Sequence, residues 1–337
     1  MPSSKDIKRR IKSINSTKKI TRAMEMISAV KMRRAVSSVL SIRPYAHSAW
    51  SVLTNLARTY ESFGKGLLEV REVKRVLMVV VASDRGQCGS FNTQIAKKIK
   101  QELLNPERLK TNRIGNKSIK SESVSSTELK VDFITIGKKG ENMVRKIHPV
   151  KSDKAGSPAT KFNEVKNEII AAFSDGTRFA DISDIKPLSK IVMEEYLAKK
   201  YDKVVVIYTD YISTIVQKTR IRQILPISKI DMEKQIAEMD ILAKEYGLEE
   251  PAVEYKIEPS PREVLEFILP RLIEMQLFHA ILESEASEQS ARMMAMRNAT
   301  DAAKEMSDDL TLAYNQIRQG KITQEIAEIS AGRAALE

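Results

Sequence analysis

The chain has few cysteines, histidines and aromatic residues, and the shortages of cysteine and histidine each exclude a class of protein or site. Of its 337 residues, one is cysteine, three are histidine and 5% are aromatic. A lone cysteine cannot form an internal disulfide, which favours a reducing compartment over a disulfide-rich secreted scaffold. The histidines are too scattered for a metal site. No stretch approaches the roughly 18–20 apolar residues of a membrane-spanning helix.

The composition and charge of the chain favour a folded basic protein. Hydrophobic residues make up 42% of the chain, which is enough for a packed core in one large domain or two smaller ones. The formal net charge is +12, with an isoelectric point near 9.5. Such a chain is attracted to polyanions or to an acidic protein partner.

The first 60 residues predict a long helix, because residues 4–59 contain one proline and no glycine. Apolar residues at 4,3 spacing restart after the polar stretch "NSTKK": Ile7, Ile11 and Ile14, then Ile20, Met24 and Ile27. This is a coiled-coil pattern with a stutter. The basic, serine-rich start resembles a transit peptide, but the continuing helical pattern favours the first turns of the helix.

Residues 262–335 predict the partner helix. A 4,3,4,3,4 spacing runs through Ala299, Ala303, Met306, Leu310, Ala313 and Ile317, and restarts at Ile322, Ile326 and Ile329. Pro270 should kink this helix. Residues 262–282 are apolar nearly all round, which indicates burial against the middle of the chain. Residues 1–34 carry eleven basic and two acidic side chains, and the second helix is mildly acidic, so we expect the two helices to pair.

The middle of the chain predicts an α/β domain with a mostly parallel sheet. Apolar runs indicate strands at 75–82, 130–136 and 203–208, and a last antiparallel strand at 212–226. Helical patterns lie at 93–104, 138–147, 163–172 and 193–199. Residues 105–129 read as a surface loop, and residues 229–247 as a short extra helix.

The stretch "ASDRGQCGSFNTQIAKK" at 82–98 has the strand–glycine–helix layout of a phosphate-binding loop. It lacks the Walker lysine and the G-x-G-x-x-G pattern, so a structural turn is the favoured interpretation. Ser90 or Asn92 can cap the following helix. Cys88 lies near Arg85 but has no fixed base. No catalytic triad or cofactor site emerges, which predicts a domain without an active site.

Two further functions stay open at this point. The basic N-terminal helix is compatible with a coiled-coil nucleic-acid-binding protein, although it offers no aromatic stacking platform. A salt-titrated filter-binding assay would identify such a protein. A dinucleotide-dependent enzyme built on the middle sheet is the weaker alternative.

Four stretches closely resemble the gamma subunits of F-type ATP synthases. They are "DIKRRIKSINSTKKITRAMEMISAVKMRRA" (6–35), "SDRGQCGSFN" (83–92), "ESEASEQSARMMAMRNATDAAKEM" (283–306) and "LTLAYNQIRQGKITQEIAEISAGRAAL" (310–336). The resemblance implies a long antiparallel coiled coil of the N- and C-terminal helices with a Rossmann-like α/β domain between them. It also implies a non-catalytic central-stalk rotor that couples ion flow through the membrane ring to ATP synthesis in an alpha–beta hexamer.

The resemblance further implies domain boundaries. These are an N-terminal coiled-coil helix (1–60), a Rossmann-like base domain (70–228), a helical insertion and linker (229–260) and a C-terminal coiled-coil helix (261–337). It makes the stretch with Gly86, Cys88 and Gly89 a structural turn. The absence of a presequence before about residue 4 predicts a bacterial protein, peripheral on the cytoplasmic face of the cell membrane.

The resemblance also implies partner contacts. The expected hexamer contacts are Arg318, Gln319, Thr323, Glu325, Lys31, Arg33, Arg34 and Met24. Those expected for the membrane c-ring or the epsilon subunit are Tyr255 and Glu258. The expected partners are thus alpha, beta, epsilon and the ring, with no cofactor and no nucleic acid.

Overall fold

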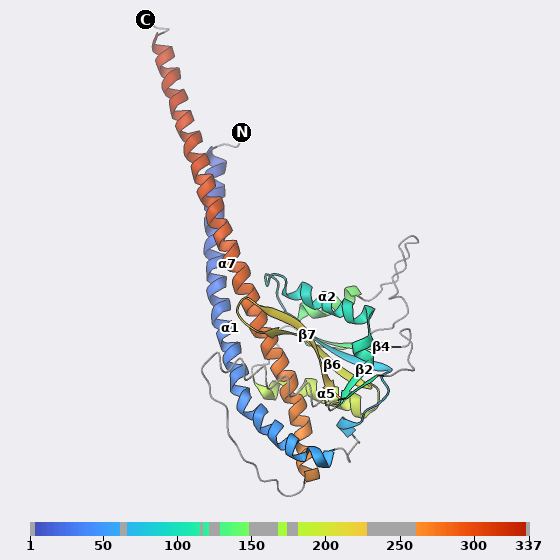
Figure 1. Cartoon of the computed structure of the whole chain (residues 1–337). Helices are drawn as coiled ribbons and strands as arrows, with labels where there is room; N and C mark the ends of the chain where they lie inside the picture. Colours follow the sequence, from blue (N-terminus) through green and yellow to red (C-terminus); the bar gives the residue numbers. More distant parts are fainter. Residues whose placement is uncertain are drawn as a thin grey trace, which may run out of the picture. The chain divides into compact units, whose positions relative to one another are not determined.

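The computed structural model describes residues 4–60, 66–114, 117–120, 129–147, 168–173, 181–227 and 261–334 (Figure 1). The chain divides into two compact units. One comprises Met1–Val30 with Arg292–Glu337, and the other comprises Lys31–Ala291. Helices α1 (Ser4–Tyr60) and α7 (Pro261–Ala334) each contribute to both units. None of the described helices is long and apolar enough to cross a membrane.

The first unit is an antiparallel pair of helices, formed by the start of α1 and the end of α7. Thr300 hydrogen-bonds Thr21 across the pair, and Ser307 hydrogen-bonds Asn15. The residue numbers therefore increase along α7 as they decrease along α1, which makes the two helices antiparallel. On α1 the buried and partly buried positions recur at 4,3 spacing at Ile7, Ile11, Ile14, Lys18, Thr21, Glu25 and Ser28. On α7 they recur at Met296, Thr300, Ala303, Ser307, Leu310, Tyr314 and Ile317. This spacing confirms the predicted coiled-coil seam.

The predicted positions of this seam were wrong in three places. Ile20 and Ile27 are 58% and 57% exposed, Met306 is 54% exposed, and the predicted restart at Ile322, Ile326 and Ile329 is exposed as well. The seam instead continues without a stutter through polar or small side chains such as Thr21 and Ser28. The physical reason is hydrogen bonding, because Thr300 donates to the Thr21 hydroxyl at 2.7 Å and Thr21 donates to the Lys18 carbonyl at 3.1 Å.

The second unit is built on a mixed five-stranded sheet in the order β5-β4-β1-β6-β7. Its strands are β1 (Arg75–Val81), β4 (Lys130–Ile136), β5 (Ile169–Phe173), β6 (Lys203–Tyr211) and β7 (Gln217–Leu225). Strand β1 runs parallel to both β4 and β6, β5 runs parallel to β4, and only β7 is antiparallel. The three strands predicted from apolar runs at 75–82, 130–136 and 203–208 are confirmed.

The remaining elements of this unit cover or extend the sheet. They are η1 (Gly66–Leu68), α2 (Phe91–Leu104), α3 (Glu107–Lys110), the hairpin of β2 (Thr111–Ile114) and β3 (Lys117–Lys120), α4 (Lys138–Ile147), η2 (Ile182–Ile185) and α5 (Lys186–Leu197). One face of β1 packs with Ile95 and Ile99 of α2 in a shared apolar core. Within α7, every residue from Leu272 to Ser284 is buried, whereas Phe267 is 71% exposed. The predicted burial of residues 262–282 is therefore confirmed only from Leu272 to Leu282.

Three other expectations need correction. Residues 169–173 form strand β5 rather than the end of a helix, because they add to the edge of the sheet beside β4. Part of 105–129 is the α3 turn and the β2–β3 hairpin rather than a plain loop. Strand β7 begins at Gln217 and not at 212, since Ser213 N–H donates to the Val216 carbonyl and closes a turn before it. The predicted helix at 229–247 lies outside the described residues.

Candidate functional site

The glycine-containing turn after β1 is held together by its own side chains. Asn92 donates from Nδ2 to Ser83 Oγ at 2.7 Å and to Cys88 Sγ at 3.2 Å, and its Oδ1 accepts from Ser83 N at 3.3 Å. Ser83 in turn donates to the Arg85 carbonyl at 2.7 Å. Cys88 is 2% exposed inside this network. The turn is therefore a packed connection, and its thiol is shielded from solvent.

The predicted capping of α2 was wrong. Ser90 occupies the N-cap position in helical conformation and makes no side-chain capping bond. Asn92 is not a cap either, because its amide group is used by Ser83 and Cys88. Asn92 instead connects the two ends of the turn, and the Ser90 hydroxyl accepts a hydrogen bond from Gln94 of the same helix.

Two glycines at this end of the sheet have positive φ angles, which residues with a Cβ rarely adopt. Gly89 has a φ of 55°, and a Cβ there would lie 3.9 Å from the Ala291 carbonyl oxygen of α7. Gly137, which the sequence did not single out, has a φ of 87°, and a Cβ would lie 2.2 Å from the Ala82 carbonyl oxygen. Gly86 has neither a positive φ nor a neighbour within 4 Å of such an atom. The β4–α4 connection is therefore the closest backbone approach here.

Helix α7 lies at the carboxyl ends of the sheet strands, which is where an α/β enzyme usually binds its ligand. In open parallel sheets that site is at the carboxyl ends of the strands, where the strand order reverses, which here is between β1 and β6. Ser287 Oγ donates to the Thr209 carbonyl of β6 at 3.1 Å, and Gly89, which follows β1, lies next to Ala291. Among the described residues, no group of His, Cys, Asp and Glu side chains is placed to hold a metal ion.

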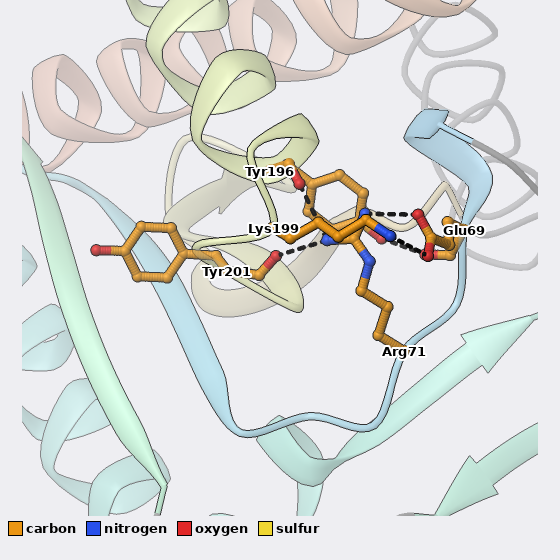
Figure 2. Close-up of polar contacts among 5 residues, drawn as sticks. All are labelled: Glu69, Arg71, Tyr196, Lys199 and Tyr201. Atoms are coloured by element: carbon orange, nitrogen blue, oxygen red, sulfur yellow. Dashed lines mark hydrogen bonds and ion pairs between the residues drawn. The ribbon is translucent and has the colours of Figure 1, made fainter.

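A polar cluster joins the segment before β1 to the carboxyl end of α5 (Figure 2). Arg71 donates from Nη1 to the Tyr196 carbonyl at 3.0 Å and from Nη2 to Glu69 Oε2 at 2.8 Å. Its guanidinium lies over the Tyr196 ring, 4.7 Å from the centroid. Lys199 Nζ lies 3.2 Å from Glu69 Oε1, and Arg71 also reaches the Tyr201 carbonyl.

The electrostatics of this cluster fit a structural role. Hydrogen bonds from Arg71, then from Lys199, lower the pKa of the Glu69 carboxyl below its ordinary value. Burial raises the pKa of the Tyr196 hydroxyl, which donates to the Glu69 carbonyl at 2.5 Å. A cation bound to the last carbonyls of a helix is also favoured by the helix dipole. No sequence signal marked this cluster, because Arg71 and Tyr196 are 125 residues apart.

The predicted basic contact residues of α1 are accessible. Lys31, Arg33 and Arg34 are exposed, whereas Met32 between them is buried and its Sδ accepts from Tyr211 OH at 3.9 Å. Met24, which belongs to the other unit, is partly buried.

The predicted contacts near the end of α7 are also exposed. Arg318, Gln319, Thr323 and Glu325 all belong to a stretch in which every residue from 318 to 331 is exposed. Thr323 donates from its hydroxyl to the Gln319 carbonyl at 3.0 Å. The expected contacts Tyr255 and Glu258 lie outside the described residues.

Exposed aliphatic side chains lie both at positions predicted for the seam or a strand and at positions outside them. On the two long helices these are Ile20, Met26, Ile27, Val30, Met306, Leu312, Ile322, Ile326 and Ile329. In the turn between β6 and β7 they are Ile212, Ile215 and Val216. Large apolar side chains that stay exposed on ordered elements are typical of surfaces that bind a partner.

Comparisons with known proteins agree on one family. The ATP synthase family profile matches residues 3–336. The ATP synthase gamma chain of Roseiflexus castenholzii is 38% identical over 339 residues, which span 100% of this chain and 99% of the relative. The gamma chain of Chloroflexus aurantiacus is 38% identical over 342 residues, with the same coverage of both chains.

Solved structures share the fold. A chain of the Euglena gracilis mitochondrial ATP synthase (OSCP/F1/c-ring, rotational state 3) aligns with a TM-score of 0.57 and 16% identity, over 99% of this chain and 94% of that one. A chain of the Tetrahymena thermophila mitochondrial ATP synthase (central stalk/c-ring) gives 0.52 and 22%, over 83% and 99%. At these identities the structures support the fold alone. From the profile and the relatives, the chain belongs to the ATP synthase gamma-chain family.

Proposed function

We propose that this chain is the rotating shaft that couples ion flow through a membrane ring to ATP synthesis in an alpha–beta hexamer, and that it has no catalytic site of its own. The observation that carries this proposal is the placement of α7 at the carboxyl ends of the strands. Ser287 bonds the Thr209 carbonyl of β6, and Ala291 lies beside Gly89 in the turn that follows β1. The surfaces available to a partner include the long helices and the turn between β6 and β7.

The mechanism follows from unequal contacts. A shaft transmits free energy when each of three catalytic subunits meets a different face of it, because each subunit then favours a different conformation. Helices α1 and α7 offer unlike faces: α1 carries the exposed bases Lys31, Arg33 and Arg34, whereas the last turns of α7 carry a row of exposed isoleucines. A symmetric shaft would bias all three subunits equally.

We propose the individual contacts from the resemblance to gamma subunits. Arg318, Gln319, Thr323 and Glu325 contact the upper part of the hexamer, and Met24 with the basic residues Lys31, Arg33 and Arg34 contacts an acidic segment of beta. Tyr255 and Glu258 contact the c-ring or the epsilon subunit. The complex is peripheral on the cytoplasmic face of a bacterial membrane, and the coupling ion is a proton or sodium. Membership of the gamma-chain family does not favour the nucleic-acid alternative.

A reversible cross-link tests rotation directly. In a Cys88→Ala background, Arg34→Cys is paired with a single cysteine on an acidic segment of beta. Cys88 is buried and its sulfur makes only weak hydrogen bonds, with Ser83, Arg85 and Asn92, so its replacement should leave ATP hydrolysis within a few-fold of normal. Oxidation should stop multisite ATP turnover, and reduction should restore it, because the link blocks movement without touching a catalytic group. Undiminished turnover in a fully cross-linked complex would refute the rotor proposal.

A further inference from the structure

Helix α7 is bonded to the sheet through two buried serines, Ser287 and Ser290, which are both 0% exposed. Ser287 Oγ donates to the Thr209 carbonyl of β6 at 3.1 Å, and Ser290 Oγ donates to the Thr214 carbonyl in the turn between β6 and β7 at 2.6 Å. Gln217, the first residue of β7, donates from Nε2 to Ser290 Oγ at 3.3 Å. The helix is therefore bonded to one strand, to the turn after it and to the next strand.

These two serines use their hydroxyls differently from other hydroxyl residues of α7. Thr311 and Thr323 each donate to the carbonyl four residues earlier in the same helix, which is a common bond for a hydroxyl side chain in a helix. Ser287 and Ser290 donate to the sheet instead. Burial alone does not account for this difference, because Ser284 of α7 is 2% exposed and its Oγ has no hydrogen-bond partner among the described residues.

The turn that accepts these bonds is held to the sheet by bonds of its own. Strands β6 and β7 pair as far as Tyr211 and Gln217, and Val216 N–H donates to Ser213 Oγ at 3.1 Å. Gln217 Nε2 also donates to the Thr214 carbonyl at 3.0 Å, so one amide group bonds both the turn and α7. Tyr211 OH lies 3.4 Å from the Thr214 hydroxyl. A displacement of α7 must therefore strain the end of the β6–β7 pair.

Directional bonds restrain the helix in a way that its neighbouring alanines do not. Ala286 is buried and Ala291 is partly buried, and their small side chains allow a close approach to the strand ends. Apolar contact of this kind is non-directional, whereas a hydrogen bond restricts both distance and angle. The bonds of Ser287 and Ser290 therefore oppose rotation of α7 about its axis and sliding of α7 along the sheet.

We propose that Ser287 and Ser290 are positioning residues that fix α7 to the carboxyl ends of the strands and set the torsional stiffness of that connection. They act through the Thr209 and Thr214 carbonyls. The inference rests on the proposed function, since a shaft under load must turn together with the sheet. Replacing both serines by alanine should loosen this connection without detaching the helix, because the surrounding apolar packing remains.

Thermal fluctuation of a stalled complex measures this stiffness. The test variant is Ser287→Ala with Ser290→Ala, and the matched control is Ser284→Ala, which removes a buried hydroxyl of α7 that has no partner among the described residues. Every chain carries Cys88→Ala and Lys190→Cys, an exposed position on α5 to which a gold nanorod is attached. The chains are assembled with purified alpha and beta subunits that are fixed to a surface. Without ATP, the angular variance of the rod should be about two-fold larger in the double variant than with both serines present, and unchanged in the control.

The outcomes separate this inference from the proposed function. If the rod on the chain with both serines does not rotate when ATP is added, the rotor proposal is wrong. If that rod rotates, but the double variant shows no larger angular variance than the control, the serines only satisfy buried polar groups and the inference is overturned. A lower unfolding temperature of the free double variant would not change that conclusion, because stability and angular variance are measured separately. Ser290→Ala alone, which removes the bonds to Thr214 and Gln217, repeats the measurement if the double variant assembles poorly.

Discussion

At the scale of single residues, the end of helix α5 shows why a lysine occupies a backbone position that usually favours glycine. Lys199 adopts a φ of 57° just after α5, a position that usually favours glycine. Its N–H donates to the Tyr196 carbonyl, and Lys200 N–H donates to the Glu195 carbonyl, which together close the helix in a Schellman arrangement. The lysine is used there because its ammonium reaches Glu69. The left-handed backbone conformation at Lys199 therefore accompanies an ion pair with Glu69, which lies in the segment before β1.

His279 on α7 should make the stability of the chain depend on pH. It is fully buried, and burial, followed by the charge of Arg222, lowers its pKa to about 3. The unfolded chain binds a proton near pH 6.5, whereas the folded chain does not until about pH 3, so stability is lost as pH falls between those values. By pH 5 the loss is about 2 kcal/mol.

The measurement compares His279→Leu with the unchanged chain in urea unfolding at pH 7 and pH 5. The variant should lose about 2 kcal/mol less between the two pH values. His47 and His148 are present in both proteins and serve as the internal control. Equal losses in the two proteins would mean that His279 is not kept neutral in the folded chain.

At the scale of elements, sequence patterns predict the strands and helices that apolar residues determine. They do not predict the parts of the structure that polar contacts determine. Strand β1 was predictable because Val76–Val81 is an unbroken apolar run that is buried in the sheet. The residues that form the seam of the helix pair were not predictable in the same way, because Thr21 and Ser28 occupy the seam while Ile20 and Ile27 remain exposed. Pattern reading assumes that isoleucine is buried, and that assumption fails at Ile20 and Ile27, which are 58% and 57% exposed.

In the candidate site, too, the sequence predicts the local turn but not the contacts between distant segments. The turn around Cys88 was recognised as structural from its missing phosphate-binding residues, but the position of α7 at the sheet edge depends on Ser287 and Ala291, about 200 residues later in the chain. The cluster of Arg71 with Tyr196 likewise depends on a contact between distant segments. No local pattern encodes such pairings.

The threonine pair of the seam yields a prediction about helix pairing. Thr300 and Thr21 are buried, and their hydroxyls are 2.7 Å apart. Either Thr21→Val or Thr300→Val alone leaves one hydroxyl without its cross-helix partner, which should destabilise the pair by about 1 kcal/mol. The double variant should cost less than the sum of the two, because both hydroxyls leave together.

Amide hydrogen exchange of residues 10–28 reports this pairing in the full chain. The matched control is Thr17→Val, which removes an exposed hydroxyl that bonds only the Ser13 carbonyl of its own helix. Exchange should accelerate about five-fold in each single seam variant and little in the control. Strictly additive effects in the double variant would show that the two hydroxyls do not interact.

At the scale of the whole molecule, the distribution of apolar residues differs between the two units. The α/β unit buries strands β1 and β6 and the stretch of α7 from Leu272 to Leu282. The other unit has a narrow seam and leaves aliphatic side chains such as Ile27, Leu312 and Ile329 exposed. A monomer rarely keeps so many large apolar groups in water, so this unit is suited to completing its burial inside an assembly.

Removing the end of α7 should separate folding from assembly. Residues 318–331 are all exposed, so deleting residues 321–337 should change the unfolding temperature of the free chain by no more than about 2 °C, within the range expected for surface changes. The same deletion should weaken retention on a purified alpha–beta hexamer at least ten-fold, since burying even one isoleucine stabilises a complex by about 2 kcal/mol. A full-length control with Ile322→Ser, Ile326→Ser and Ile329→Ser, three side chains that are 47%, 59% and 73% exposed, tests the apolar row without shortening the helix. If both proteins were retained as tightly as the unchanged chain, the row would face solvent in the complex, and a contact between the end of α7 and the hexamer would be excluded.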